Sequence, residues 1–412
     1  MELQESRLSN GMRVVTERMP EVRSVTLGVW VGVGARDEPD ELSGASHFLE
    51  HLVFKGTPTR SAREIAEVIE AVGGDMNAHT SRESTAYYTR LPAEHLDLAL
   101  DIMGDVLTQP SFRPPEVESE RRVILEEILM HLDMPDSLVH TLLSEQLFPH
   151  HPLGREVAGT KETVEVITRD QIAGFFDRWY HSDNMSVVGA GLLDHDQLVD
   201  ELERTLGKID HGIKPVRRPP VEPVAGPVVR TSEIEQVHIE LGWRGIDHHD
   251  DDRWALSVLN QIVGGGMSSR LFQQVREERG LSYSIYSWAS TSADSGSAGI
   301  YSATNPSRVT ELLEVLDEEI AQLLAGGVTE AELALAQGCL DGSLVLSLES
   351  SEARMERLGW SLVHRDEVVP LDVELERLRA VTIDDCHRVA ERVFGSERTM
   401  SVIGPVDESS LR

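Results

Sequence analysis

The sequence predicts an α+β protein with two homologous domains, each a mostly antiparallel sheet with helices packed on one face. Three observations support this class. The chain has 412 residues, more than a single hydrophobic core usually holds. A series of strand and helix patterns in the first half returns in the second half, about 215 residues later. Five prolines between residues 215 and 227 separate the two copies and indicate a stiff, extended linker.

These boundaries give a first domain over residues 1–212, a linker over 213–228 and a second domain over 229–412. Alternating apolar residues predict first-domain strands at 12–19, 24–33 and 184–192, with a hairpin over 75–91. Helical spacing predicts a short helix around residue 47 and further helices at 61–72, 93–108, 116–131, 137–147 and 168–179. In the second domain, strand 236–243 and helix 253–263 mirror strand 24–33 and the helix around residue 47.

The clearest part of the repeat lies near the end of each domain. Residues 168–189 begin Thr-Arg-Asp-Gln-Ile and end Met-Ser-Val-Val-Gly. Residues 382–404 begin Thr-Ile-Asp-Asp-Cys and end Met-Ser-Val-Ile-Gly. Two copies of one folding unit are the simplest explanation for this similarity.

The formal net charge of −33 argues against nucleic acid as a partner. A solvated acidic surface is the simplest interpretation, although the same field would attract basic peptides. The two cysteines, Cys339 and Cys386, form no C-x-x-C pair, as expected in a reducing cytoplasm. The polar N-terminus lacks the apolar region of a signal peptide, and no apolar run is long enough to span a membrane. We therefore expect a cytoplasmic protein that does not bind membranes.

The helix around residue 47 carries a metal-binding pattern. His47 and His51 are four residues apart and Glu50 directly precedes His51, so all three side chains project from one face of the helix. Two imidazoles can hold one metal ion, and the carboxylate is close enough to act on a water molecule there. This H-x-x-E-H order is the inverted form of the zinc-peptidase motif.

The second copy of the repeat lacks these groups. Aligning the two helices sets Ser257 against His47, Asn260 against Glu50 and Gln261 against His51. The second copy cannot bind a metal through this motif. The sequence therefore predicts one active half and one non-catalytic half.

A catalytic zinc site needs a third protein ligand in addition to two histidines. The helix over 116–131 offers Glu120 and Glu127, which are seven residues apart and share one face. Placing acidic side chains beside the buried apolar stripe of a helix costs free energy unless they are paired or bound to a metal. Spacing alone does not choose between these two glutamates.

Together these features resemble the pitrilysin-type, or M16, metallopeptidases, and most closely the branch that contains mitochondrial processing peptidase and its bacterial relatives. The resemblance covers nearly the whole chain and depends on long motifs. Besides His47-x-x-Glu50-His51 and Glu127, these motifs are Gly73-Gly74, Asn77-Ala78, Thr80-Ser81-Arg82-Glu83, His151-Pro152-Leu153-Gly154-Arg155, Asp183-Asn184-Met185, Gly264-Gly265-Gly266-Met267-Ser268-Ser269-Arg270-Leu271 and Arg279-Gly280-Leu281-Ser282-Tyr283-Ser284.

The resemblance implies that His47, His51 and Glu127 are the ligands of one zinc ion per chain. It implies that Glu50 is the general base that activates the water at the zinc and passes its proton to the leaving amine. Glu120 matches an outer acid that orients a ligand histidine or balances charge.

The resemblance also assigns substrate-binding residues. Asn77 and Ala78 match an edge strand that pairs with the substrate backbone, a mode that tolerates many sequences. Arg276 and Tyr283, in the second half, match a pair that approaches the substrate carbonyl, where their charge and hydroxyl would suit a developing oxyanion. His79 departs from the aromatic residue usual after Asn-Ala. We expect it to be an outward edge-strand residue, because a fourth ligand would close the water site.

The predicted function is that of a zinc-dependent endopeptidase acting on peptides or on unfolded, presequence-like segments. The glycine-rich stretch 264–269 resembles the loop of the non-catalytic partner subunit in the family and, within the same chain as an intact motif, implies a homodimer. Two alternatives remain. The chain could be a non-catalytic or assembly subunit of the same family, or a catalytic subunit that needs a separate partner.

Overall fold

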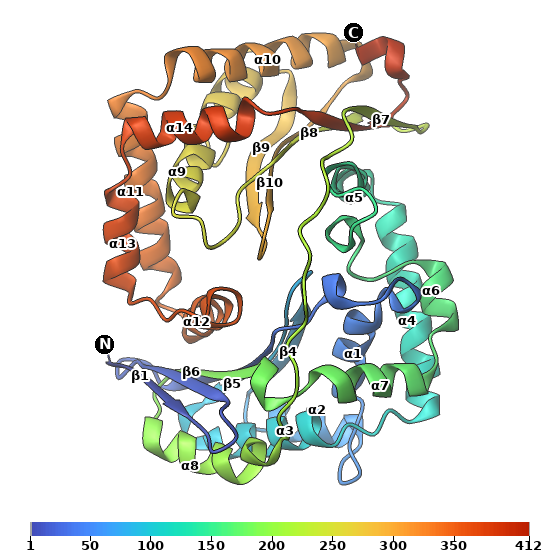
Figure 1. Ribbon diagram of the computed structural model, residues 1–412, viewed down its shortest axis with the longest axis vertical. Coiled ribbons are helices and arrows are strands. Elements are labelled where there is room, and N and C mark those ends of the chain that lie inside the picture. The colour runs from blue at the N-terminus through green and yellow to red at the C-terminus, as the bar shows by residue number, and fades with distance from the viewer. Residues whose placement is uncertain (1, 412) are drawn as a thin grey trace. The chain divides into compact units, whose positions relative to one another are not determined.

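The computed structural model describes residues 2–411, which form two compact units (Figure 1). Unit 1 comprises the chain up to Leu129, Glu156–Arg217 and Ser347–Pro370. Unit 2 comprises Met130–Arg155, Arg218–Leu346 and the chain from Leu371 onward. Each unit contains one sheet, so the predicted α+β class with two sheet domains is confirmed.

The sheet of unit 1 has six strands in the order β1-β2-β6-β3-β5-β4. The strands are β1 (Glu2–Arg7), β2 (Arg13–Arg18), β3 (Ser24–Val31), β4 (Asp75–Thr80), β5 (Thr85–Pro92) and β6 (Met185–Gly191). Only β2 and β6 run parallel; every other neighbouring pair is antiparallel. Strand β1 has a polar sequence without apolar alternation, which is why the sequence pattern did not predict it.

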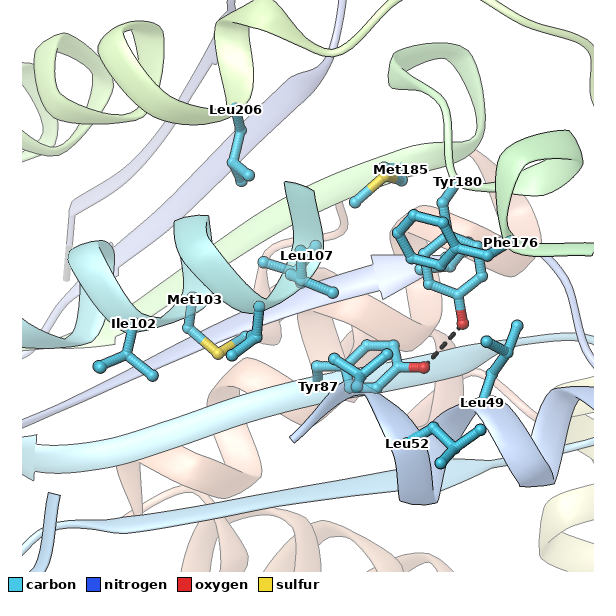
Figure 2. Packing of buried hydrophobic residues seen from close by; sticks show 14 of the residues in the cluster. Leu49, Leu52, Tyr87, Ile102, Met103, Leu107, Phe176, Tyr180, Met185 and Leu206 are labelled. Atoms are coloured by element: carbon cyan, nitrogen blue, oxygen red, sulfur yellow. Dashed lines mark hydrogen bonds between the residues drawn. The ribbon is translucent and has the colours of Figure 1, made fainter. Parts of the chain in front are cut away.

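Helices cover one face of this sheet and close the main core of unit 1. They are α1 (Ala45–Val53), α2 (Ala62–Glu70), α3 (Leu96–Thr108), α4 (Pro114–Leu132), α6 (Lys161–Val166), α7 (Arg169–Trp179) and α8 (His195–Thr205). Figure 2 shows Leu49 and Leu52 of α1 beside Tyr87 of β5 and Tyr180, which follows α7. The hydroxyls of Tyr87 and Tyr180 are 2.7 Å apart, so these two fully enclosed polar groups satisfy each other.

The other face of the sheet is covered by α12 (Ser351–Arg365), which comes from the second half of the sequence. Trp30 of β3 packs there against Met355 and Leu358 of the helix. Two glycines permit the close approach. A β-carbon at Gly28 would lie 2.3 Å from Sδ of Met355, and one at Gly359 would lie 2.0 Å from Nε1 of Trp30.

Unit 2 repeats the topology of unit 1 without a counterpart of β1. Its sheet has the order β7-β11-β8-β10-β9, in which only β7 and β11 are parallel. These strands are β7 (Gly226–Thr231), β8 (Val237–Arg244), β9 (Ser282–Thr291), β10 (Gly296–Thr304) and β11 (Thr399–Gly404). The helices are α5 (Pro135–Leu147), α9 (Arg253–Val263), α10 (Val309–Gly326), α11 (Glu330–Ser347), α13 (Leu371–Arg379) and α14 (Ile383–Phe394). The repeat seen in the sequence is thus a repeat of sheet order.

Each unit contains one helix from the other half of the sequence. The units therefore differ in their boundaries from the predicted domains 1–212 and 229–412. Helix α5 precedes the linker in sequence but packs on β8 and β11 of unit 2, where Leu138 and Val139 meet Tyr301 and Ile403. Helix α12 follows the linker but belongs to unit 1. A sequence boundary cannot show this exchange, because the apolar stripe of a helix does not specify which sheet it covers.

Residues 210–225 form neither helix nor strand, whereas the last three residues of the predicted linker over 213–228 belong to the strand Gly226–Thr231. Arg217, which ends the Glu156–Arg217 segment of unit 1, is held by the Asp37 carboxylate and the Glu83 carbonyl oxygen, each at 2.8 Å. Across residues 2–411, no single helix is both long and apolar enough to cross a membrane; the bent pair α11 and α12 meets the criterion only when the two helices are counted together.

The close packing of α12 gives a testable expectation for Gly359→Ala. The added methyl group must displace Trp30 or the helix, so we expect a loss of about 1–3 kcal/mol in the free energy of unfolding, measured by urea denaturation. Gly338→Ala in α11 is the matched control, because no atom lies within 4 Å of a β-carbon at that position. The free energy of unfolding of the control variant should be unchanged or higher by up to about 1 kcal/mol. Equal stability of the two variants would contradict the packing described here.

Candidate metal centre

The helix α1 is fixed in direction by its apolar side and by its N-terminus. Phe48, Leu49 and Leu52 are buried in the main core of unit 1, with each such side chain contributing about 1.5–3 kcal/mol. The buried Glu38 carboxylate accepts hydrogen bonds from the backbone N–H groups of Gly44 at 2.8 Å and Ser46 at 2.6 Å. This carboxylate satisfies free donors at the start of the helix. Glu38 lies in an irregular loop, where no pattern in the sequence predicted its role.

With the apolar side fixed, the histidines project toward α4. The imidazole centroids of His47 and His51 are 4.7 Å apart. Glu127 of α4 places Oε2 at 3.7 Å from Nε2 of each histidine. One ligand atom from each of the three residues lies within 4.8 Å of the other two. Two imidazole nitrogens and one carboxylate oxygen are a donor set that suits zinc, so these residues fit a zinc ion.

Glu120 lies behind His51 and not among the converging ligand atoms. Its Oε2 is 3.2 Å from Nδ1 of His51, and its Oε1 is 2.8 Å from Nζ of Lys55. The Nδ1–H group of His51 therefore donates to Glu120, which leaves Nε2 free for a metal. The geometry thus separates the two glutamates that spacing could not distinguish. Lys55 was missed in the sequence, although it follows His51 by four residues and compensates the charge of a buried carboxylate.

Burial shifts the pKa values of His47 and Glu50, both on α1, in opposite directions. It lowers the pKa of His47 to about 4, with the charge of His51 adding to the effect. His47 is therefore neutral at pH 7 and can bind a metal without first losing a proton. Burial raises the pKa of Glu50, while Thr80 and His51 oppose the shift. A raised pKa makes the Glu50 carboxylate a better proton acceptor near neutral pH.

The strand β4, which carries Asn77 and Ala78, is one of the two edge strands of the unit 1 sheet and pairs within it only with β5. The backbone N–H of Ala78 donates to the side-chain oxygen of Asn77 at 2.9 Å. Ala78 packs against the main core, whereas Asn77 is exposed. The strand ends at Thr80, beside Glu50, so a peptide added to this edge would run past the candidate base.

His79 lies on the sheet face that α12 covers. Its ring is 5.4 Å from that of Trp30 and 6.3 Å from that of Tyr88, and its Nδ1 is 3.8 Å from the Glu356 carboxylate. It is not one of the three residues whose ligand atoms converge.

Arg276 and Tyr283 both belong to unit 2, where they form a pair. The Arg276 guanidinium lies 4.3 Å from the centroid of the Tyr283 ring, and its Nη1 donates to the Tyr283 carbonyl oxygen at 3.1 Å. The Tyr283 side chain is 79% exposed, so its hydroxyl is accessible. Their action on a substrate carbonyl stays a prediction.

In α9, the helix that mirrors α1, the counterparts of the metal-binding residues make ordinary contacts. The Ser257 hydroxyl donates to the Arg253 carbonyl oxygen at 3.0 Å, and the Gln261 amide contacts Sγ of Cys339 at 3.4 Å. The structure therefore agrees with a single metal-binding half.

The sequence matches two family descriptions, one after the other along the chain. Residues 13–161 match Insulinase (Peptidase family M16), and residues 167–338 match Peptidase M16 inactive domain. An uncharacterized zinc protease of Streptomyces coelicolor is 43% identical over 410 residues, which cover 97% of this chain and 89% of that protein. The chain belongs to peptidase family M16. The resemblance predicted from the motifs is confirmed at the level of the family.

A second relative and two solved structures agree with this chain in length or fold. An uncharacterized zinc protease of Bacillus subtilis is 38% identical, covering 96% of this chain and 97% of that one. A crystal structure titled as the peptidase M16 inactive domain from Pseudomonas fluorescens superposes with a TM-score of 0.93 at 21% identity, covering 99% of both chains. A protease from Helicobacter pylori gives 0.92 at 22% identity, covering 98% of this chain and 99% of that one. At these identities, the two structures support the shared α+β fold.

The contact between Glu120 and His51 predicts the effect of Glu120→Gln in this M16 protein. Losing the charged acceptor should weaken zinc binding by about 10- to 100-fold, because His51 loses its orientation and part of its basicity. Zinc affinity is measured by competition with a chromogenic chelator. Glu126→Gln, an exposed neighbour of Glu127 on the same helix, is the matched control and should bind zinc like the wild type. An unchanged affinity in Glu120→Gln would show that Glu120 does not support the site.

Proposed function

We propose that this M16 protein is a zinc-dependent endopeptidase that hydrolyses peptides or unfolded, presequence-like segments. The observation that carries the proposal is that ligand atoms of His47, His51 and Glu127 lie within 4.8 Å of one another. Glu50 lies on α1, the helix that carries the two histidines. We assign these three residues as ligands of one zinc ion per chain. Zinc, when bound, polarises a carbonyl group and lowers the pKa of water.

The chain's own residues supply the remaining steps. Glu50 accepts a proton from the attacking water and passes it to the leaving amine. Glu120 orients His51 through Nδ1, and Lys55 balances the buried charge. Asn77 and Ala78, on the open edge of β4, hold the substrate backbone as an added strand. We assign to Arg276 and Tyr283 the stabilisation of negative charge on the substrate carbonyl oxygen.

The intact donor set favours an enzyme over a non-catalytic assembly subunit, since such a subunit has no need for three converging ligands beside a buried carboxylate. Because both the metal-binding half and the glycine-rich stretch 264–269 are in one chain, we propose that the protein acts as a homodimer without a separate partner. We also propose a cytoplasmic location, on the basis of two unpaired cysteines.

The decisive experiment compares zinc content and peptide cleavage in the wild type and in Glu50→Gln. Both proteins should bind about one zinc ion per chain. Turnover of a quenched fluorescent peptide should fall by at least about 100-fold in the variant, because only proton transfer is lost. Glu126→Gln serves as the control for a nearby loss of charge and should keep both properties. The proposal fails if Glu50→Gln still cleaves at the wild-type rate or if the wild type binds no zinc.

The proposed homodimer is tested by light scattering of the purified chain coupled to an activity assay of each size fraction. We expect peptide cleavage to coincide with a species of twice the chain mass of 45.7 kDa. Activity confined to a monomer fraction, or activity that appears only after addition of a second polypeptide, would refute it.

A further inference from the structure

Two acidic residues of α12 lie one helical turn apart and face the edge of the unit 1 sheet at β4 and β5. They are Glu352 and Glu356. The first of them has a cation nearby, since Nη1 of Arg90 on β5 is 3.8 Å from its Oε2. Both carboxylates lie close to Tyr88 of β5, because burial and then the charges of Glu352 and Glu356 raise the pKa of that phenol to about 12. The two acids therefore share one environment but differ in their partners.

Glu356 has no such cation. Within residues 2–411, no lysine or arginine lies within ion-pair distance of it, and its one ionisable partner is His79 of β4, with Nδ1 at 3.8 Å from Oε1. The Glu356 side chain is only 34% exposed. The imidazole is kept in place by Trp30, whose ring it meets edge-on at 5.4 Å. A carboxylate that is mostly enclosed without a donor or a cation costs free energy whenever it is ionised.

The two partners differ in where they hold a proton. Burial, with the charge of Glu352 adding to it, raises the pKa of Glu356 from 4.5 to about 7. Burial lowers the pKa of His79. A proton at this contact therefore resides on the carboxyl group, opposite a neutral imidazole.

Protonation changes what the contact can do. At 3.8 Å the two atoms are just beyond hydrogen-bond distance, so a small rotation of the Glu356 side chain closes the gap. A protonated carboxyl group can then donate to Nδ1 of the neutral His79 ring. An ionised carboxylate has no proton to donate, and it repels Glu352 one turn away.

The other charged groups on this face of the sheet leave Glu356 uncompensated. Strands β3 and β6 carry no titratable side chain. On β2, Glu17 pairs with Arg354 and Arg357 of α12. On β4, Asp75 adds negative charge at the same edge. Ionisation of Glu356 therefore adds to an existing excess of negative charge.

We propose that His79 and Glu356 form a proton-dependent contact that fastens the edge strand β4 to α12 at acidic pH and opens at alkaline pH. His79 is the residue that departs from the aromatic side chain usual at this position, and the contact gives it a role. The same strand carries Asn77 and Ala78, so its fastening affects the edge to which the proposed function assigns the substrate. The contact itself does not depend on that function.

The direction of the pH dependence follows from the raised pKa. Because Glu356 is more easily protonated in the folded protein than at its ordinary pKa of 4.5, the contact contributes fully below that pH. Its contribution is lost as the pH rises through about 7. Glu356→Gln is neutral at every pH, and its amide can donate to His79 as the protonated carboxyl group does.

The test is hydrogen–deuterium exchange of the full-length protein, read in the segment 75–80 by mass spectrometry. Wild type and Glu356→Gln are compared at the same pH, which cancels the intrinsic effect of pH on exchange. At pH 8.5 we expect β4 to exchange about three- to tenfold faster in the wild type, because partial exposure reduces the effect of ionisation. At pH 5.5 the two proteins should agree within about twofold.

Two further variants locate the effect. His79→Phe keeps a ring beside Trp30 and removes the acceptor, so β4 should exchange about three- to tenfold faster than in the wild type at pH 5.5 and equally fast at pH 8.5. Glu349→Gln, an exposed acid just before α12, is the matched control and should behave like the wild type at both pH values. The strand β1, at the other edge of the sheet, serves as an internal reference and should not change.

Equal exchange of β4 in the wild type and in Glu356→Gln at pH 8.5 would overturn the proposal. A change of the same size in β1 and β4 would also overturn it, since it would reflect the stability of the whole unit. The same holds if His79→Phe exchanges like the wild type at pH 5.5. None of these measurements uses a substrate, so their failure leaves the proposed peptidase activity untouched.

Discussion

The direction in which α1 is held is the constraint on which the candidate metal centre depends. Phe48, Leu49 and Leu52 lie in the main core of unit 1, so the helix cannot rotate without exposing them. The opposite side of the same helix then presents His47, Glu50 and His51. Because three apolar side chains contribute several kcal/mol together, the orientation of the polar side is set before any metal binds. Preorganised ligands of this kind lose little entropy when the ion arrives.

Charged groups that lie inside the molecule have defined partners, and these partners decide their roles. Glu120 is held between His51 and Lys55, and its contact with Nδ1 orients the histidine ring. Glu240 is held by His140 and Trp288 in a similar way, but its contacts lead outward to Tyr286. In both places a carboxylate orients an imidazole through Nδ1 and leaves Nε2 for another task. In unit 1 we assign that nitrogen to the proposed metal site, and in unit 2 it contacts the Tyr286 hydroxyl.

The two units show how one topology supports different chemistry. The strand order β2-β6-β3-β5-β4 of unit 1 matches the order β7-β11-β8-β10-β9 of unit 2. In each unit one helix covers the second face of the sheet, α12 in unit 1 and α5 in unit 2. In unit 1, α1 carries the candidate metal ligands His47 and His51, whereas in unit 2 the equivalent α9 carries Ser257, Asn260 and Gln261. Residues 167–338, which include α9, match the description Peptidase M16 inactive domain. The exchange of α5 and α12 means that neither half of the sequence contains all the helices of one unit.

The sequence by itself determined the features that depend on short spacing. Positions i and i+4 of a helix share a face whatever surrounds them, so His47, Glu50 and His51 could be grouped from the sequence, and the repeat predicted two similar α+β sheets. Only the tertiary structure placed Glu127 against both histidines and Glu120 behind one of them, since the two glutamates share one face of α4. It also paired His140 with Glu240, a hundred residues apart, and exchanged α5 with α12. Such contacts depend on how whole elements pack, which the periodicity of any single segment does not encode.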